Sequence, residues 1–131
     1  AYERSGPERI LSTFVVLSAW AETVAEDDVA ARLELGRLLS RLVVLRRLSL
    51  GVARELEQGR APAVEAALVK DLGTAFEGEV VESVRRFAQA RPGDPTTPLG
   101  RLLADGVLHG PAFTLRGGTS EVLRSIVAKG L

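Results

Sequence analysis

The chain has 131 residues, a length typical of one domain, and its 17 lysine and arginine residues balance 17 acidic residues. Because the formal net charge is zero, no overall field attracts the protein to nucleic acid or to anionic lipid. The absence of cysteine excludes disulfides and thiolate metal sites, and a single histidine, His109, provides no histidine cluster for a metal. With no apolar run of about 18 residues and no signal-peptide pattern, we expect a cytoplasmic protein without a membrane span.

Apolar residues recur three or four positions apart through most of the sequence, which is the spacing of amphipathic helices. No stretch alternates polar and apolar residues for long enough to predict a strand. The predicted helices span residues 7–25, 28–58, 62–89, 99–108 and 120–129. We therefore expect an all-α protein with a single domain over residues 1–131. The predicted fold is an up-down-up-down four-helix bundle with three long helices and short closing helices.

Proline and glycine mark the ends of several predicted helices. Gly59 is placed to end the second helix and Pro62 to open the third, while Gly110-Pro111 is expected to end the fourth. His109, which precedes that pair, is interpreted as a helix-end or loop residue rather than a catalytic base. Phe14 and Trp20 are interpreted as ordinary core aromatics of the first helix.

Charged residues on the long helices are most simply interpreted as solvated. In the third helix this applies to Lys70 and to Glu77, Glu79 and Glu82. The second helix carries a run of arginines, for which a polar subunit seam or phosphate contacts remain alternatives to a solvated flank. These arginines are Arg37, Arg41, Arg46, Arg47 and Arg54.

The C-terminal stretch from Arg116 to Ala128 reads Arg-Gly-Gly-Thr-Ser-Glu-Val-Leu-Arg-Ser-Ile-Val-Ala. Two adjacent glycines followed by Thr119, Ser120 and an apolar-periodic run predict a tight loop that turns into a helix. Thr119 or Ser120 can serve as the N-cap, and Glu121 then lies in the first turn, where the helix dipole favours an acid. A glycine-rich approach to a helix N-terminus also predicts an anion-binding site, although a simple capped helix would have the same pattern.

This stretch resembles the closing signature of the acyl-CoA dehydrogenases, whose members end on a Gly-Thr-Ser-Glu-Ile/Val-x-Arg-x-Ile-Ile/Val-Ala helix. About ten consecutive positions agree in residue type. Residues 56–62 followed by residues 64–70 also look like the family's "G-x-x-P…E-A-S/A-x-x-K" helix-turn-helix. The resemblance covers only the C-terminal helical domain of the family. Because Met is absent even from position 1, we expect a fragment of a longer protein that lacks the N-terminal and middle domains.

The resemblance implies an FAD-dependent enzyme that removes a proton and a hydride from an acyl-CoA thioester, creating an α,β double bond. In that family the hydride passes to FAD, and the enzymes are usually tetramers with this bundle at the core. Gly118, Thr119, Ser120 and Glu121 match the family's contact to the adenylate part of FAD. The fragment alone is expected to be inactive, because flavin and thioester sites need the other domains.

The catalytic glutamate of many family members has no counterpart at the same position of this chain. Many members carry a glutamate directly before Gly-Thr, where this chain has Gly117. A minority branch uses the glutamate of a Glu-Arg pair at the start of the first bundle helix. Resemblance to that branch favours Glu3 as the base and Arg4 beside the substrate, with Glu8 and Arg9 as the alternative register. Acids at a helix start are also favoured by the helix dipole alone.

Two segments depart from the family pattern. An Arg-x-x-Phe-Gly segment after the first bundle helix is replaced by a connection at residues 26–28, and a Gln-x-x-Gly-Gly-x-Gly segment is replaced by residues 90–95. Both family segments bind the neighbouring subunit's FAD. Their loss favours an unusual subunit arrangement, such as a hetero-oligomer rather than a homo-oligomer, or weak flavin binding. The alternatives to an enzyme fragment are a non-catalytic subunit and a helical interaction module.

Overall fold

The computed structural model describes residues 11–88, 94, 96–115 and 117–130, and all regular structure within these ranges is helical. The predicted all-α class is therefore confirmed. The helices are α1 (Leu11–Ala21), α2 (Val29–Glu57), α3 (Ala63–Phe87), α4 (Pro98–Phe113) and α5 (Ser120–Gly130). None of the described helices is long and apolar enough to cross a lipid bilayer.

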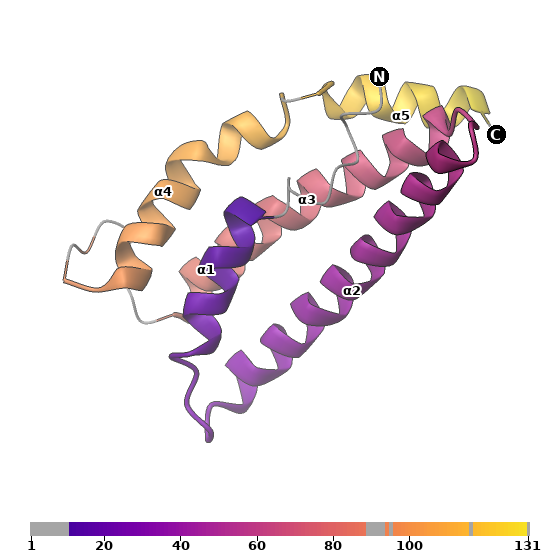
Figure 1. The fold of residues 1–131 in the computed structure, drawn as a ribbon. Helices are drawn as coiled ribbons and strands as arrows, with labels where there is room; N and C mark the ends of the chain where they lie inside the picture. The colour runs from indigo at the N-terminus through magenta and orange to yellow at the C-terminus, as the bar shows by residue number, and fades with distance from the viewer. Residues whose placement is uncertain (1–10, 89–93, 95, 116, 131) are drawn as a thin grey trace.

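Helix α3 lies at the centre of the bundle and packs against each of the other four helices (Figure 1). Helix α2 runs antiparallel to it, since Glu34 of α2 meets Ser83 of α3 while Arg41 meets Glu79. Helices α4 and α5 follow one another along the opposite direction to α3 (Figure 1). The closing pair of short helices predicted from the sequence thus lies end to end beside one long helix.

Local sequence signals account for both ends of α2. Its first turn is capped by Asp28, whose carboxylate accepts a hydrogen bond from the Ala31 N–H at 2.9 Å. At the other end Gly59 has a φ of 74°, a backbone conformation that favours glycine. The Gly59 N–H donates to the Leu56 carbonyl and the Arg60 N–H to the Glu55 carbonyl, which is the Schellman arrangement. The predicted end at Gly59 is confirmed.

Helix α4 is longer than predicted. It begins at Pro98, with the Thr97 hydroxyl accepting from the Gly100 N–H at 3.0 Å, and continues through Pro111 to Phe113. The expectation that Gly110-Pro111 ends this helix is therefore wrong. Proline removes one N–H donor from the helix, but burial of the Phe113 side chain holds the last turn against the bundle. His109 accordingly lies inside the helix, with its side chain exposed.

The main hydrophobic core fills the space between α1, α2, α3 and α4. Trp20, Phe76, Leu17, Leu38 and Leu103 are its largest inaccessible members. Helix α4 comes close to α3 at Gly106, where an added Cβ would lie 3.1 Å from a methyl group of Val81. Such interdigitation supplies most of the favourable free energy of folding.

Three predictions about single side chains are wrong because each helix has a different number of neighbours. Lys70 and Glu77 were expected to be solvated, but both are buried, since α3 is covered on nearly every side. Phe14 was expected in the core, but it is 46% exposed on the outer side of α1. Trp20, by contrast, is a core aromatic as predicted.

A network of charged side chains joins α2 to α3. Arg37 donates to both carboxylate oxygens of Glu34 and, at 2.7 Å, to Glu79, which also pairs with Arg41. Glu34 additionally accepts a hydrogen bond from the Ser83 hydroxyl at 2.5 Å. The hydrogen bonds from Arg37, together with that from Ser83, outweigh burial and lower the pKa of the Glu34 carboxyl from 4.5 to about 2.

This depressed pKa predicts a stability that falls in acid. Glu34 stabilises the folded state fully above its unfolded pKa of 4.5, and the contribution is lost as the pH falls toward about 2. Replacing Glu34 with Gln should therefore reduce the free energy of unfolding at pH 7. We expect the difference between the parent and E34Q chains to shrink by up to about 2 kcal/mol at pH 3. Urea unfolding of both chains at pH 7 and pH 3, followed by circular dichroism, measures this difference in the free energy of unfolding.

The matched control is Glu22→Gln, an equivalent substitution at an exposed residue just after α1. It should leave the pH dependence of unfolding close to that of the parent chain. If the free energies of unfolding of the parent and E34Q chains differed by the same amount at pH 7 and pH 3, Glu34 would not titrate as the geometry indicates.

Candidate functional site

The bend between α4 and α5 has the backbone that its two glycines predict. Gly117 has a φ of 71° and Gly118 a φ of 114°, and both values lie in the region that L side chains rarely adopt. The chain can therefore turn sharply at the two glycines and enter α5. A glycine-rich approach to a helix N-terminus is suited to contact with an anion.

Thr119, one of the two predicted candidates, is the N-cap of α5. Its hydroxyl oxygen accepts a hydrogen bond of 3.5 Å from the Val122 N–H, and its carbonyl accepts one of 3.0 Å from the Leu123 N–H. Hydrogen bonds from its own backbone N–H and from the Thr119 hydroxyl lower the pKa of the Glu121 carboxyl, and nearby Arg124 adds to this. At the start of α5, Gly118, Thr119 and Ser120 are half-buried and Glu121 is exposed.

Buried polar groups of α3 hold the end of α4 that leads into the bend. The Lys70 ammonium donates to the Phe113 carbonyl at 3.1 Å and also to the Thr74 hydroxyl, which itself approaches the same carbonyl at 3.4 Å. Phe113 is the last residue of α4, so a positive charge lies where the helix dipole is negative. Lys70 therefore acts as a C-terminal cap supplied by a neighbouring helix.

The other side of the bend is tied to the same part of α3. Arg124 of α5 donates to the Asp71 carboxylate at 3.1 Å, and Leu123 inserts into the bundle with only 1% of its surface exposed. Val122, the residue before it, is half exposed. Lys70 thus fixes the end of α4, where the bend begins, and the adjacent Asp71 fixes the position of α5, into which the bend leads. The sequence reasoning missed both, because mid-helix charges normally face solvent.

A largely apolar cavity of about 510 Å³ lies between α1 and α4 and reaches Phe113. Its wall from α1 includes Val15 and Val16, while Asp105 and His109 of α4 lie on its lining. The volume is within the range of small-molecule pockets. The lining residues are Val15, Val16, Leu102, Asp105, Gly106, His109, Ala112 and Phe113.

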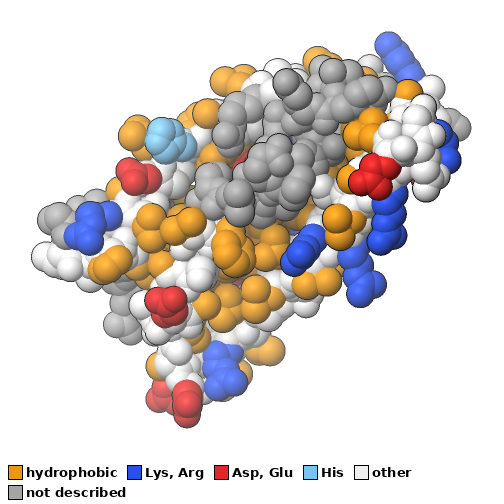
Figure 2. All heavy atoms as spheres, in the orientation of Figure 1, with side chains coloured by type: hydrophobic (Ala, Val, Ile, Leu, Met, Phe, Trp, Pro, Cys, Tyr) orange, Lys and Arg blue, Asp and Glu red, His pale blue; other side chains and the backbone are white. Residues whose placement is uncertain are grey.

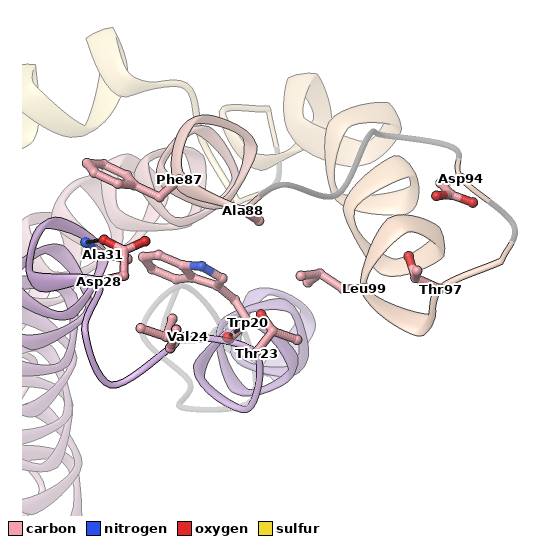
Figure 3. A pocket seen from close by; sticks show the side chains of 11 residues that line it. Trp20, Thr23, Val24, Asp28, Ala31, Phe87, Ala88, Asp94, Thr97 and Leu99 are labelled. Carbon is pink, nitrogen blue, oxygen red and sulfur yellow. Dashed lines mark hydrogen bonds between the residues drawn. The ribbon is translucent and has the colours of Figure 1, made fainter.

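A second cavity of about 460 Å³ lies where the C-terminal ends of α1 and α3 meet the N-terminal ends of α2 and α4 (Figure 3). Trp20 and Phe87 line it with their ring centroids 6.2 Å apart. Its polar atoms are engaged locally, since Asp28 caps α2 and Thr97 caps α4. Because these groups already serve helix ends, this cavity is interpreted as a structural junction.

The predicted catalytic residues Glu3 and Arg4, and the alternatives Glu8 and Arg9, lie outside the described residues. The described part of α1 begins at Leu11 and contributes Val15 and Val16 to the cavity beside α4. In the ranges that the structure describes, no three His, Cys, Asp or Glu side chains gather in a way that could hold a metal ion.

Comparison with known proteins returns no assignment. No protein-family model matches the chain, and no curated protein matches it significantly.

The cap on α4 predicts the effect of removing the buried ammonium. Lys70→Met keeps the length of the side chain but removes the donor to the Phe113 carbonyl. It should cost about 1–3 kcal/mol of unfolding free energy and loosen the end of α4. Chemical denaturation measures the first effect, and faster amide hydrogen exchange in residues 109–115 measures the second.

Lys129→Met is the matched control, because Lys129 is exposed in the last turn of α5. It should change neither quantity appreciably. A K70M chain whose stability falls while exchange in residues 109–115 stays at the parent rate would argue against the capping role.

Proposed function

We propose that the chain is the C-terminal helical bundle of an FAD-dependent acyl-CoA dehydrogenase, contributing flavin contacts and oligomerisation to the complete enzyme. The reaction is the α,β-dehydrogenation of an acyl-CoA thioester. The observation that carries the proposal is the bend at Gly117-Gly118, which leads into an N-capped helix within a helical bundle. That bend is also the place where the sequence resembles the family.

The donor set at the bend suits the adenylate part of FAD. The Ser120 N–H opens α5, and the two glycines before Thr119 carry no side chains that would obstruct a ligand, while the next N–H groups are engaged by Thr119 and by the Glu121 carboxylate. The hydroxyls of Thr119 and Ser120 add polar contacts, and both residues are half-buried. When bound, FAD would accept the hydride, whereas the bend would only hold and orient it.

The apolar cavity between α1 and α4 supports an acyl substrate. Val15, Val16, Leu102 and Phe113 give it walls suited to a hydrocarbon chain. Residues 1–10, which hold Glu3 and Glu8, come directly before α1 in the chain. We propose Glu3 as the base that removes the α-proton and Arg4 as its neighbour at the substrate, with Glu8 and Arg9 as the alternative. The remaining flavin and thioester contacts would come from other domains.

A second candidate function is that of a non-catalytic subunit or helical interaction module. It is favoured by the row of apolar side chains that α2 exposes on the side away from α3. The two functions differ in one measurable respect, which is whether FAD binds the complete polypeptide.

Gly118→Ala tests the flavin proposal. The φ of 114° at this residue strains any L side chain, and the new methyl group would lie beside the amides that face the ligand. In the polypeptide expressed from its complete reading frame, FAD affinity should fall by about tenfold or more. Fluorescence titration with FAD and the absorbance of bound flavin measure the loss.

Gly73→Ala serves as the control, because an alanine Cβ there meets no described atom within 4 Å and lies inside α3. It should leave FAD affinity unchanged. If the parent polypeptide binds no FAD, the flavin proposal fails and the non-catalytic alternative stands.

The base is tested by Glu3→Gln and Glu8→Gln in the same complete polypeptide. Removing the true base should lower turnover of an acyl-CoA by about 100-fold or more, while FAD stays bound. The other substitution serves as the internal control and should have little effect. Steady-state dye reduction measures turnover, and unchanged rates in both variants would show that neither glutamate is the base.

A further inference from the structure

Helix α2 carries two heptad seams on opposite faces. The inner seam consists of positions spaced alternately four and three residues apart, and every member is buried or half-buried: Ala31, Leu35, Leu38, Leu42, Leu45, Ser49, Val52 and Leu56. A second set, offset by two residues, has the same spacing and is exposed at every member: Val29, Leu33, Gly36, Ser40, Val43, Arg47, Leu50 and Arg54. Since two residues turn a helix by about 200°, this outer seam points away from the bundle.

The outer seam has no neighbour among the described elements, because α2 packs extensively only on α3. Val29 is 66%, Leu33 71%, Val43 55% and Leu50 47% exposed. Isolated apolar side chains on a surface need no explanation, but a seam whose exposed apolar members extend from Val29 to Leu50, about six turns of one helix, does. Figure 2 shows hydrophobic and basic side chains side by side along the edge of the molecule that α2 forms.

Basic residues predominate on this face, although Glu57, the next position of the same spacing, is acidic and exposed in the last turn of α2. Arg47 and Arg54 lie on the seam two turns apart, and Arg46 lies beside it; within the described part of the chain none of the three takes part in an ion pair. Elsewhere on the bundle most arginines do pair, as Arg37 and Arg41 do with Glu79. No member of the outer seam is acidic.

This charge pattern disfavours a second copy as the occupant. If two α2 helices paired along the full length of their outer seams without a stagger, Arg47 and Arg54 would meet an arginine, a glycine, a serine or an apolar side chain, and no carboxylate. Burying guanidinium groups without carboxylates costs several kcal/mol. The seam instead suits a surface that supplies apolar side chains together with Asp or Glu.

We propose that the outer seam of α2 docks an acidic amphipathic helix of a different protein. The apolar side chains of that helix would pack between Leu33, Val43 and Leu50, and its carboxylates would pair with Arg47 and Arg54. An added Cβ at Gly36 or Gly51 meets no described atom within 4 Å, so the backbone of α2 can be approached closely at both glycines. This proposal does not depend on the flavin function, and it specifies the partner for the interaction role proposed above as the second candidate function.

The probe is a fluorescently labelled synthetic peptide of three heptads, with leucine and alanine at its core positions and glutamate at the flanking positions. Held at nanomolar concentration and titrated with the 131-residue chain, it should bind saturably with micromolar affinity. The double substitution R47E/R54E should weaken binding by about tenfold or more. A peptide with lysine in place of glutamate should bind R47E/R54E better than it binds the parent chain, a gain that misfolding would not produce.

R85E/R86E is the matched control, since it makes the same change of net charge at exposed residues of α3 and should leave affinity within about twofold. V43S/L50S should also weaken binding, with circular dichroism confirming an intact bundle. Absence of saturable binding would overturn the proposal. So would a dimer in light scattering that R47E/R54E dissociates, or binding to phosphatidylserine vesicles that R47E/R54E abolishes while the peptide remains unbound.

Discussion

The structure depends on one constraint, which is that α3 must be covered on nearly all sides while still carrying charged residues. Its neighbours are placed so that several charged groups of α3 meet matching groups on them. Lys70 caps α4, Asp71 pairs with α5, and Glu79 receives two arginines of α2. A charge left inside the bundle without such contacts would cost several kcal/mol, so these polar contacts specify where the outer helices lie.

This arrangement places the bend between α4 and α5 under the control of α3. Lys70 fixes the last carbonyl of α4, and Asp71, the next residue, fixes the first turns of α5 through Arg124. The intervening glycines take positive φ angles because they carry no Cβ, and the helices on both sides of them are held by α3. A loop meant to present backbone amides to a ligand needs such support, since small displacements of donors weaken binding.

Helix α2 packs extensively only on α3, and it carries two seams. Its inner seam supplies part of the core, whereas the outer seam repeats the same spacing without a partner. The polar network around Glu34 anchors α2 to α3 and so keeps the outer seam turned outward. The bundle therefore combines a buried framework, a candidate ligand bend and a candidate docking face on separate elements.

The sequence by itself determined the helices, most of their ends and the shape of the bend. These features depend on neighbouring residues: Asp28 and Thr119 cap the turns that follow them, and Gly59, Gly117 and Gly118 take positive φ angles. Only the tertiary structure decided which faces are buried, because that depends on how many neighbours a helix has. Lys70 and Glu77 are buried on central α3 while Phe14 is exposed on α1, and α4 continues through Pro111 because α3 supplies its cap.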